Sequence, residues 1–221
     1  MTDFGLTRRE ASFLRRMRPA WRIQSFLDSI AYDVEGDGCR SPRRVLRERK
    51  AQCMDGAIFA AAALRLQGHP PLLVDLEGVW DTDHVLAVFR EARGWGAVAR
   101  SNFSGLRFRE PIHRTIRDLV ASYFESYFNL RRQKTLRRYS RPVNLSRFDA
   151  MGWMTSEEDV WTVPEYLCIV AHTPVLRARL IPELGRVDDR LRGRSVSGLR
   201  RARQCGLRRS RLRRGLTSSA T

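Results

Sequence analysis

The amino-acid sequence predicts an α+β fold in which N-terminal helices lead to a cysteine-bearing, alanine-rich helix packed on a small antiparallel sheet. The first observation is an apolar segment at residues 53–67, which holds four consecutive alanines and is followed by glycine, a common helix terminator. The second is a set of three segments rich in β-formers, at residues 72–76, 84–89 and 95–99. The third is the short link at residues 91–94, which predicts that the last two segments form a hairpin.

Start signals predict the helices that precede this core. Residues 7–10 read Thr-Arg-Arg-Glu, the pattern of a capping box, so a helix is expected from Arg8. Pro19 is expected to open a second helix at its first position. A serine followed by proline at residues 41 and 42 predicts a short helix that runs to about Arg47.

The second half of the chain has weaker patterns. Residues 116–129 are expected to form one helix with four aromatic side chains on one side, namely Tyr123, Phe124, Tyr127 and Phe128. Residues 106–109 are expected to continue the sheet, and the acidic run at residues 156–159 suggests another helix start. The remainder of residues 142–176 shows no clear periodicity, so its role stays open.

Charge divides the chain into a body and a tail. The 221 residues carry a formal net charge of +17. Residues 177–221 hold 14 Arg against 3 acids, which is +11, and this leaves +6 for residues 1–176. We therefore expect one domain over residues 1–176, with its core at about 40–130, and a disordered Arg-rich tail that binds polyanions non-specifically.

Composition also argues against several classes of protein. The longest uninterrupted apolar run, residues 57–64, is too short to span a bilayer, and the N-terminus has no secretory pattern, so a cytoplasmic protein is expected. The four cysteines form no CxxC pair and no zinc-binding spacing with histidine. We expect no metal, no cofactor and no disulfide. Four acidic residues, Asp75, Glu77, Asp81 and Asp83, match no calcium loop and are expected to be solvated.

Cys53 stands where the alanine-rich helix begins. Unpaired backbone N–H groups and the helix dipole lower the pKa of a thiol at such a position. The same N–H groups can stabilise an oxyanion, so the Cys53 backbone, together with Gln52, is a candidate oxyanion site. A thiol nucleophile also needs a base that an orienting group holds in place.

His84 and a polar residue on the next strand are the candidates for these two roles. A three-residue hairpin loop gives paired positions that sum to 186 and sets His84 opposite Asn102, whereas a four-residue loop gives 185 and sets it opposite Ser101. Asn102 is preferred because its amide oxygen can accept from the ring N–H and fix the tautomer, and Ser101 is the alternate. The alternative to a catalytic role is a surface histidine paired with Asp83. Asp81 and Asp83 could equally raise the pKa of the ring and favour an ion pair of His84 with a Cys53 thiolate. His113 and His172 have no evident partners and are interpreted as structural.

This order of residues resembles the transglutaminase-like superfamily, which has a papain-like Cys-His fold. The superfamily includes transglutaminases, microbial transglutaminase-like proteases and amidases, and relatives of arylamine N-acetyltransferases. The matching segments are residues 52–57, 83–85 and 94–98, within a region that spans about 40–102. The resemblance implies that Cys53 is the nucleophile and His84 the base, with no metal or organic cofactor.

The chain departs from the family pattern at one position. The family usually has Asp four residues after the tryptophan, and that position here is Ala99. The third role would therefore fall on Asn102 or Ser101, or be absent. Residues 99–111 also resemble a group of uncharacterised bacterial proteins, but this resemblance does not identify a substrate.

Three hypotheses of function follow. The first is a thiol enzyme acting by hydrolysis or acyl transfer on the amide or related acyl bond of a peptide, a protein or a small amide. The second is an inactive module of the same fold that binds a peptide or protein, which the missing Asp favours. The third is a nucleic-acid-associated protein that uses its Arg-rich segments, of which residues 131–141 are the candidate within the body.

Overall fold

The computed structural model describes residues 3–36, 38–92 and 94–188, and it confirms the α+β fold. A seven-stranded sheet has the order β6-β5-β4-β3-β7-β9, with β8 pairing to β3, and all of its pairs are antiparallel. Its strands are β3 (Leu72–Gly78), β4 (His84–Glu91), β5 (Gly94–Val98), β6 (Arg109–His113), β7 (Leu136–Ser140), β8 (Val143–Asn144) and β9 (His172–Pro174). A separate parallel pair joins β1 (Ala31–Tyr32) to β2 (Lys50–Ala51).

The helices begin largely where the start signals predict. They are α1 (Arg8–Arg15), α2 (Trp21–Ser29), α3 (Pro42–Glu48), α4 (Cys53–Leu66), α5 (Ile116–Ala121) and α6 (Thr162–Ile169), with 3-10 turns η1 (Ser104–Leu106), η2 (Phe124–Ser126), η3 (Leu145–Met151) and η4 (Ala178–Glu183). The capping box of α1 is confirmed, since Thr7 Oγ1 accepts from the Glu10 N–H at 3.3 Å. Pro19 lies just before α2 rather than at its first helical position.

The prediction of one long helix over residues 116–129 is wrong. The helix ends at Ala121 because the two tyrosines that follow are drawn into the core. The Tyr123 hydroxyl donates to the Arg107 carbonyl at 2.7 Å, and the Tyr127 hydroxyl donates to the Thr82 carbonyl at 2.5 Å. These tertiary contacts override the helical spacing of the aromatic residues.

Two further local expectations also need correction. The strand expected at residues 106–109 lies later, as β6 (Arg109–His113), because residues 104–106 form the turn η1. The acidic run at residues 156–159 does not open a helix: α6 begins at Thr162, and Ser156 Oγ instead accepts from the Glu158 N–H at 3.1 Å. Side-chain bonds of this kind favour turns over helices.

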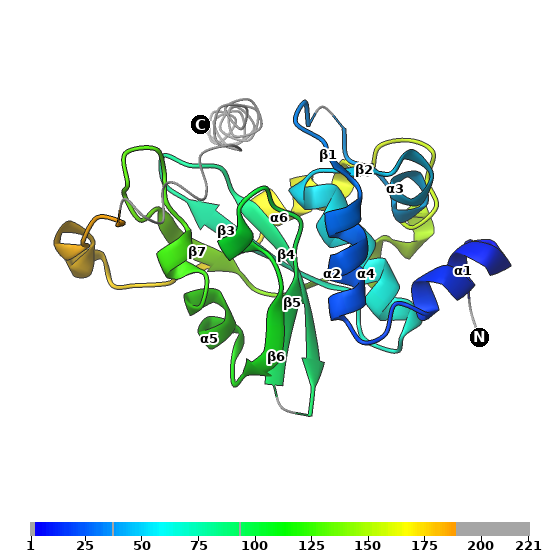
Figure 1. Ribbon diagram of the computed structural model, residues 1–221, viewed down its shortest axis with the longest axis horizontal. Helices are drawn as coiled ribbons and strands as arrows, with labels where there is room; N and C mark the ends of the chain where they lie inside the picture. The colour runs from blue at the N-terminus through cyan, green and yellow to red at the C-terminus, as the bar shows by residue number, and fades with distance from the viewer. Residues whose placement is uncertain (1–2, 37, 93, 189–221) are drawn as a thin grey trace, which may run out of the picture.

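The two faces of the large sheet pack on different elements. On β4, Val85, Ala87 and Phe89 belong to the cluster that contains α4, whereas Leu86 and Val88 belong to the cluster that contains α5. This alternation is the two-residue period of a strand buried on both faces. Figure 1 shows the result, with α4 and α5 on opposite sides of the sheet.

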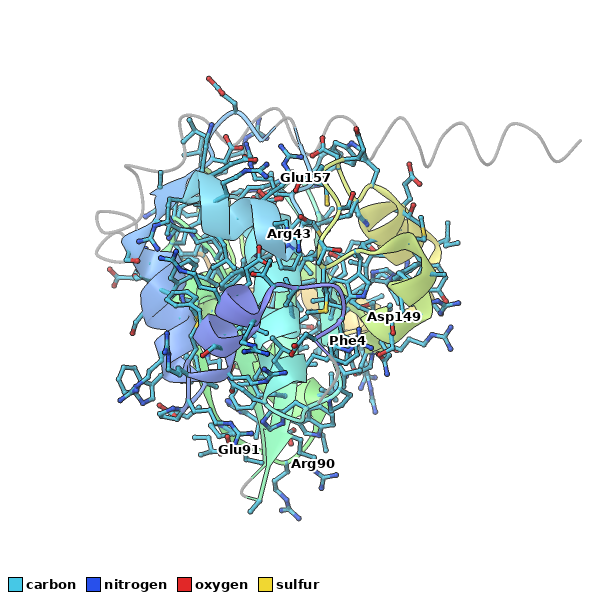
Figure 2. All side chains as sticks on the ribbon, turned by 90° about the vertical axis from the view of Figure 1, so that its right-hand side faces the viewer. Phe4, Arg43, Arg90, Glu91, Asp149 and Glu157 are labelled. Atoms are coloured by element: carbon cyan, nitrogen blue, oxygen red, sulfur yellow. The ribbon has the colours of Figure 1, made fainter. Side chains whose placement is uncertain are left out.

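Helix α4 lies along β4 with a defined direction. Its C-terminal loop places the His69 ring 5.9 Å from the Phe89 ring, near the C-terminal end of β4. The opposite end of α4, which Cys53 opens, therefore lies toward His84, at the start of β4. Arg65, in the last turn of α4, packs over Phe4 and binds Asp149 at 2.6 Å, and Figure 2 shows those two residues close together.

Gly56 permits close packing at the start of α4. A Cβ at this position would lie 2.3 Å from the Cβ of Arg100, closer than two non-bonded carbon atoms can approach. We expect Gly56→Ala to lower the free energy of unfolding by about 1–2 kcal/mol, because overpacking outweighs the gain in helix propensity. Urea denaturation measures this loss, and Gly185→Ala, where a Cβ meets no atom within 4 Å, is the control. Equal stability of the two variants would contradict the expectation.

Ordered structure continues past the expected boundary at residue 176. The segment 175–188, here called the strap, includes η4 and returns to the body, where the Val187 N–H donates to the Arg132 carbonyl at 3.0 Å. Val187 is buried, which explains why this part of the chain is held. The rest of the predicted tail, residues 189–221, lies outside the described residues. No helix in the described ranges has the length and apolar character that crossing a membrane requires.

Candidate functional site

The start of α4 is anchored by a buried carboxylate. Asp55 is fully buried and accepts from the backbone N–H of Gln52 at 3.1 Å, from the backbone N–H of Arg40 at 2.8 Å and from Arg40 Nη1 at 3.2 Å. Burial raises the pKa of Asp55 to about 6, although these bonds act in the opposite direction. The anchor holds the first turn of the helix and, with it, the half-buried Cys53.

Cys53 lies beyond the ends of the central strands. Gly56 packs against Arg100, which is two residues past the end of β5. Cys53 is three residues earlier in the helix, so it lies about 4.5 Å farther out along the helix axis. Cys53 is also close enough to Tyr127, whose hydroxyl bonds to the Thr82 carbonyl, to add, after burial and three aspartates, to the raised pKa of that tyrosine. Cys53 is therefore near the end of the sheet at which β4 begins.

His84 is a buried, neutral imidazole with one fixed tautomer. It is the first residue of β4, and its Nε2 lies 2.8 Å from the Leu106 carbonyl oxygen. Because a carbonyl only accepts, Nε2 carries the hydrogen and Nδ1 keeps its lone pair. Burial lowers the pKa of His84 to about 4, even though the Leu106 bond and the charge of Asp75 raise it.

The exposed histidine paired with Asp83 that sequence allowed is therefore excluded. Asp83 instead accepts from the Gly78 N–H at 3.1 Å. The side chain of His84 points to the α5 face of the sheet, toward Leu106, while α4 packs on the other face. Cys53 and His84 thus share one end of the sheet and approach it from opposite faces.

The predicted partner of His84 needs correction. The residue numbers of paired positions in the β4–β5 hairpin add up to 185, as for Ala87 and Val98, and not to the preferred 186. The reason is a shorter connection, since Glu91 pairs with Gly94. This is the register that favours Ser101 over Asn102, but the ladder ends before it reaches His84.

Neither polar candidate is bonded to the ring. Ser101 Oγ accepts from the Phe103 N–H at 3.0 Å, and the part of the chain that the structure describes contains no hydrogen bond from the half-buried Asn102 side chain. The carbonyl of Leu106 fixes the tautomer in their place. Sequence offers no signal for this partner, because every residue has a backbone carbonyl.

Gln52 lies directly beside the thiol. Its Oε1 is 3.8 Å from Cys53 Sγ, and its Nε2 donates to the Gly38 carbonyl at 3.0 Å. An amide nitrogen carries two hydrogens, so one more donor remains on Nε2. The backbone N–H of Gln52 is already bonded to Asp55, which leaves the side chain as the group able to bind an oxyanion.

A second histidine forms a buried ion pair that the sequence did not reveal. Asp75, Ser140 and His172 lie in one row across β3, β7 and β9, and His172 Nε2 is 3.1 Å from Asp75 Oδ2. Its Nδ1 is 2.7 Å from the Val170 carbonyl, so both ring nitrogens face acceptors and both carry hydrogen. Asp75 and Val170 accordingly raise the pKa of His172 against the effect of burial.

This pair corrects two expectations. Asp75 is fully buried rather than solvated, and the structural histidine His172 has a specific partner. An acidic residue between Val74 and Leu76 in an apolar strand was a usable signal of burial, but a partner 97 residues away was not. Because both ring nitrogens of His172 face acceptors, whereas Nδ1 of His84 keeps its lone pair, His84 is the histidine of the two that is able to accept a proton. In the described residues, no three His, Cys, Asp or Glu side chains gather as a metal site would require.

Comparison with known proteins adds no family to this geometry. The chain matches no protein-family model, and it matches no curated protein sequence. The functional argument therefore rests on the site itself.

Proposed function

We propose that the protein is a Cys53-dependent enzyme that cleaves or transfers the acyl group of an amide or related substrate. The observation that supports this most strongly is the state of His84, which is neutral above about pH 4 and keeps Nδ1 as a proton acceptor. A thiol at a helix N-terminus and a neutral imidazole at the same end of one sheet are the two groups that such chemistry needs.

The proposed reaction has two halves. His84 Nδ1 takes the proton of the Cys53 thiol, and the sulfur attacks the substrate carbonyl. The backbone N–H of Cys53 and the side-chain amide of Gln52 stabilise the oxyanion. The imidazolium of His84 then gives its proton to the leaving amine as the C–N bond breaks, and a thioester remains. Water or a second amine, deprotonated by His84, releases the acyl group and regenerates the thiol.

The resting site is expected to hold a neutral thiol and a neutral imidazole. The thiol bonds weakly to Gln52 and the imidazole to Leu106, and the two side chains approach the end of the sheet from opposite faces, so the proposed proton transfer requires substrate binding to bring them together. Catalytic hydrogen bonds are commonly long in the absence of substrate and tighten on binding.

The pH dependence of Cys53 alkylation tests this proposal. In the full chain, we expect the rate of iodoacetamide alkylation at Cys53 to show a plateau from about pH 5 to pH 8, since His84 assists throughout that range. In His84→Ala the plateau should disappear, the rate at pH 7 should fall about a hundredfold, and the rate should rise with pH only as the thiol itself ionises. Peptide mapping by mass spectrometry measures each cysteine separately.

Two controls make the result specific. His69→Ala removes a histidine at the other end of β4 and should leave the plateau unchanged. Cys168, which is half-buried like Cys53, should show the same pH profile in wild type and in His84→Ala. A wild-type Cys53 that behaves like Cys168, and does not respond to His84→Ala, would rule out the enzyme.

A non-catalytic binding module is the second candidate. Two observations favour it: Ala99 replaces the acid typical of the resembled family, and the His84 side chain is only 5% exposed. This module would retain a folded Cys53 site with free-thiol reactivity, so the same alkylation profile separates the two functions.

A further inference from the structure

A basic groove lies between the strap and the edge of the sheet formed by β7 and β9. Its volume is about 990 Å³, at the upper end of the range typical of ligand sites. Six cationic side chains line it, and no Asp or Glu does: Arg117, Lys134, Arg137, Arg138, Arg177 and Arg186. It shares no lining residue with the Cys53 site, so this inference does not depend on the proposed enzyme.

Most of these charges lack a compensating acid. Lys134 binds Glu125 at 2.8 Å, and Arg138 lies 4.0 Å from Glu77. The other four arginines have no carboxylate within ion-pair distance among residues 3–36, 38–92 and 94–188. On the opposite side of the molecule, Arg43 binds Glu10 at 3.0 Å and further arginines are paired in the same way.

The backbone bonds of the groove position these charges. Arg117 donates to the carbonyls of Pro174 and Val175, which fixes the start of the strap. Arg137 donates to the Lys134 carbonyl at 2.9 Å, and burial lowers its pKa. A concave site lined by positive charges alone concentrates a positive electrostatic potential, which attracts anions.

Trp80 adds an aromatic surface to the groove. Its side chain is 85% exposed, and its φ of 57° places it in the left-handed region that a bulky residue rarely adopts. Exposing an apolar indole ring to water is unfavourable in free energy. Its position beside several arginines therefore points to an anionic ligand that also carries a ring. Aromatic side chains beside cationic grooves are the usual means of binding unpaired bases.

We propose that this groove binds a segment of single-stranded nucleic acid, with its phosphates on the arginines and a base stacked on Trp80. The rest of this chain is excluded as the occupant by charge, because residues 189–221 carry 11 Arg and one Asp. An acidic peptide would satisfy the arginines and leave Trp80 unused. The groove is therefore the specific element, and the Arg-rich tail adds non-specific attraction.

Fluorescence anisotropy with a labelled ten-nucleotide oligothymidylate and the full chain tests the proposal. Arg177→Gln combined with Arg186→Gln should reduce the slope of log affinity against log salt by about 1.4, the value for two phosphate contacts on a single strand. Trp80→Ala should weaken binding about tenfold, and Trp80→Phe should restore most of the loss. The matched control, Arg8→Gln with Arg9→Gln, removes two exposed charges from α1 and should leave the slope unchanged.

Three results would overturn the proposal. One is an equal change of slope in the groove and control variants, which would assign binding to net charge and the tail. Another is equal competition by a ten-residue polyglutamate peptide, with no effect of Trp80→Ala, which would assign the groove to acidic proteins. The third is a mononucleotide that binds as tightly as the decamer, which would make the ligand a free nucleotide rather than a strand.

Discussion

Replacing Asp55 with alanine is expected to lower the free energy of unfolding at pH 7 by about 3 kcal/mol. Asp55 is fully buried and satisfies two backbone N–H groups and the Arg40 guanidinium at the start of α4. Alanine leaves these donors without their acceptor in a buried place, which is the larger part of the loss. Asp55→Asn should lose about 2 kcal/mol, less than alanine, because the amide oxygen still accepts from the donors on one side while the amide NH2 faces the donors on the other.

Urea denaturation followed by circular dichroism measures both losses. The control is Glu157→Ala at the residue labelled in Figure 2. It breaks an ion pair of 2.7 Å with Arg47, and both side chains are more than half exposed. Such a pair is worth about 0–1 kcal/mol, so the control should change little. If Asp55→Ala and Glu157→Ala cost the same stability, Asp55 does not anchor the helix that carries Cys53.

Acidification is expected to destabilise the wild type relative to a His84→Leu variant by about 3 kcal/mol between pH 7 and pH 4. The pKa of His84 is about 4 in the folded protein and 6.5 in the reference state, a difference worth roughly 1.4 kcal/mol per unit. Between pH 6.5 and pH 4, His84 is protonated in the unfolded chain and neutral in the folded protein. The stabilisation by neutral His84 is therefore complete above pH 6.5 and is lost as pH falls toward 4.

The difference between wild type and variant is the quantity to measure, by urea denaturation at several pH values. Asp55 acts in the opposite direction, since its pKa is raised to about 6 and its contribution falls as pH rises through that value, but it is common to both proteins. His172→Gln supplies a control of opposite sign, because the pKa of His172 is raised and its stabilisation is lost as pH rises. A difference for His84→Leu that does not vary with pH would contradict the buried neutral imidazole.

Features that depend on neighbouring residues were predictable from sequence. The capping box at Thr7, the serine cap of α3 and the alanine run of α4 are local patterns, and each produces the expected element. Cys53 was placed at a helix start by the same reasoning. The central strands also follow from local composition, because each is bounded by turn residues.

Features that depend on distant contacts were not predictable. The length of α5 is decided by the buried positions of Tyr123 and Tyr127, which its helical spacing does not encode. The orientation of His84 depends on the Leu106 carbonyl, and the ionisation of His172 depends on Asp75, 97 residues earlier in the chain. The hairpin register depends on one residue of loop length, and the strand pairing ends before His84, so neither Asn102 nor Ser101 becomes its partner.

The sheet order has a consequence for the chain as it is synthesised. β3 is the earliest strand of the large sheet, yet it lies inside it, with β4 on one side and β7 and β8 on the other. β4 follows within a few residues, whereas β7 begins at Leu136, long after β3 ends at Gly78. One edge of β3, with unpaired backbone N–H and C=O groups, thus has no partner in the nascent chain while more than fifty further residues are added. The large sheet can therefore be completed only after β7 and β9 have been synthesised, late in translation.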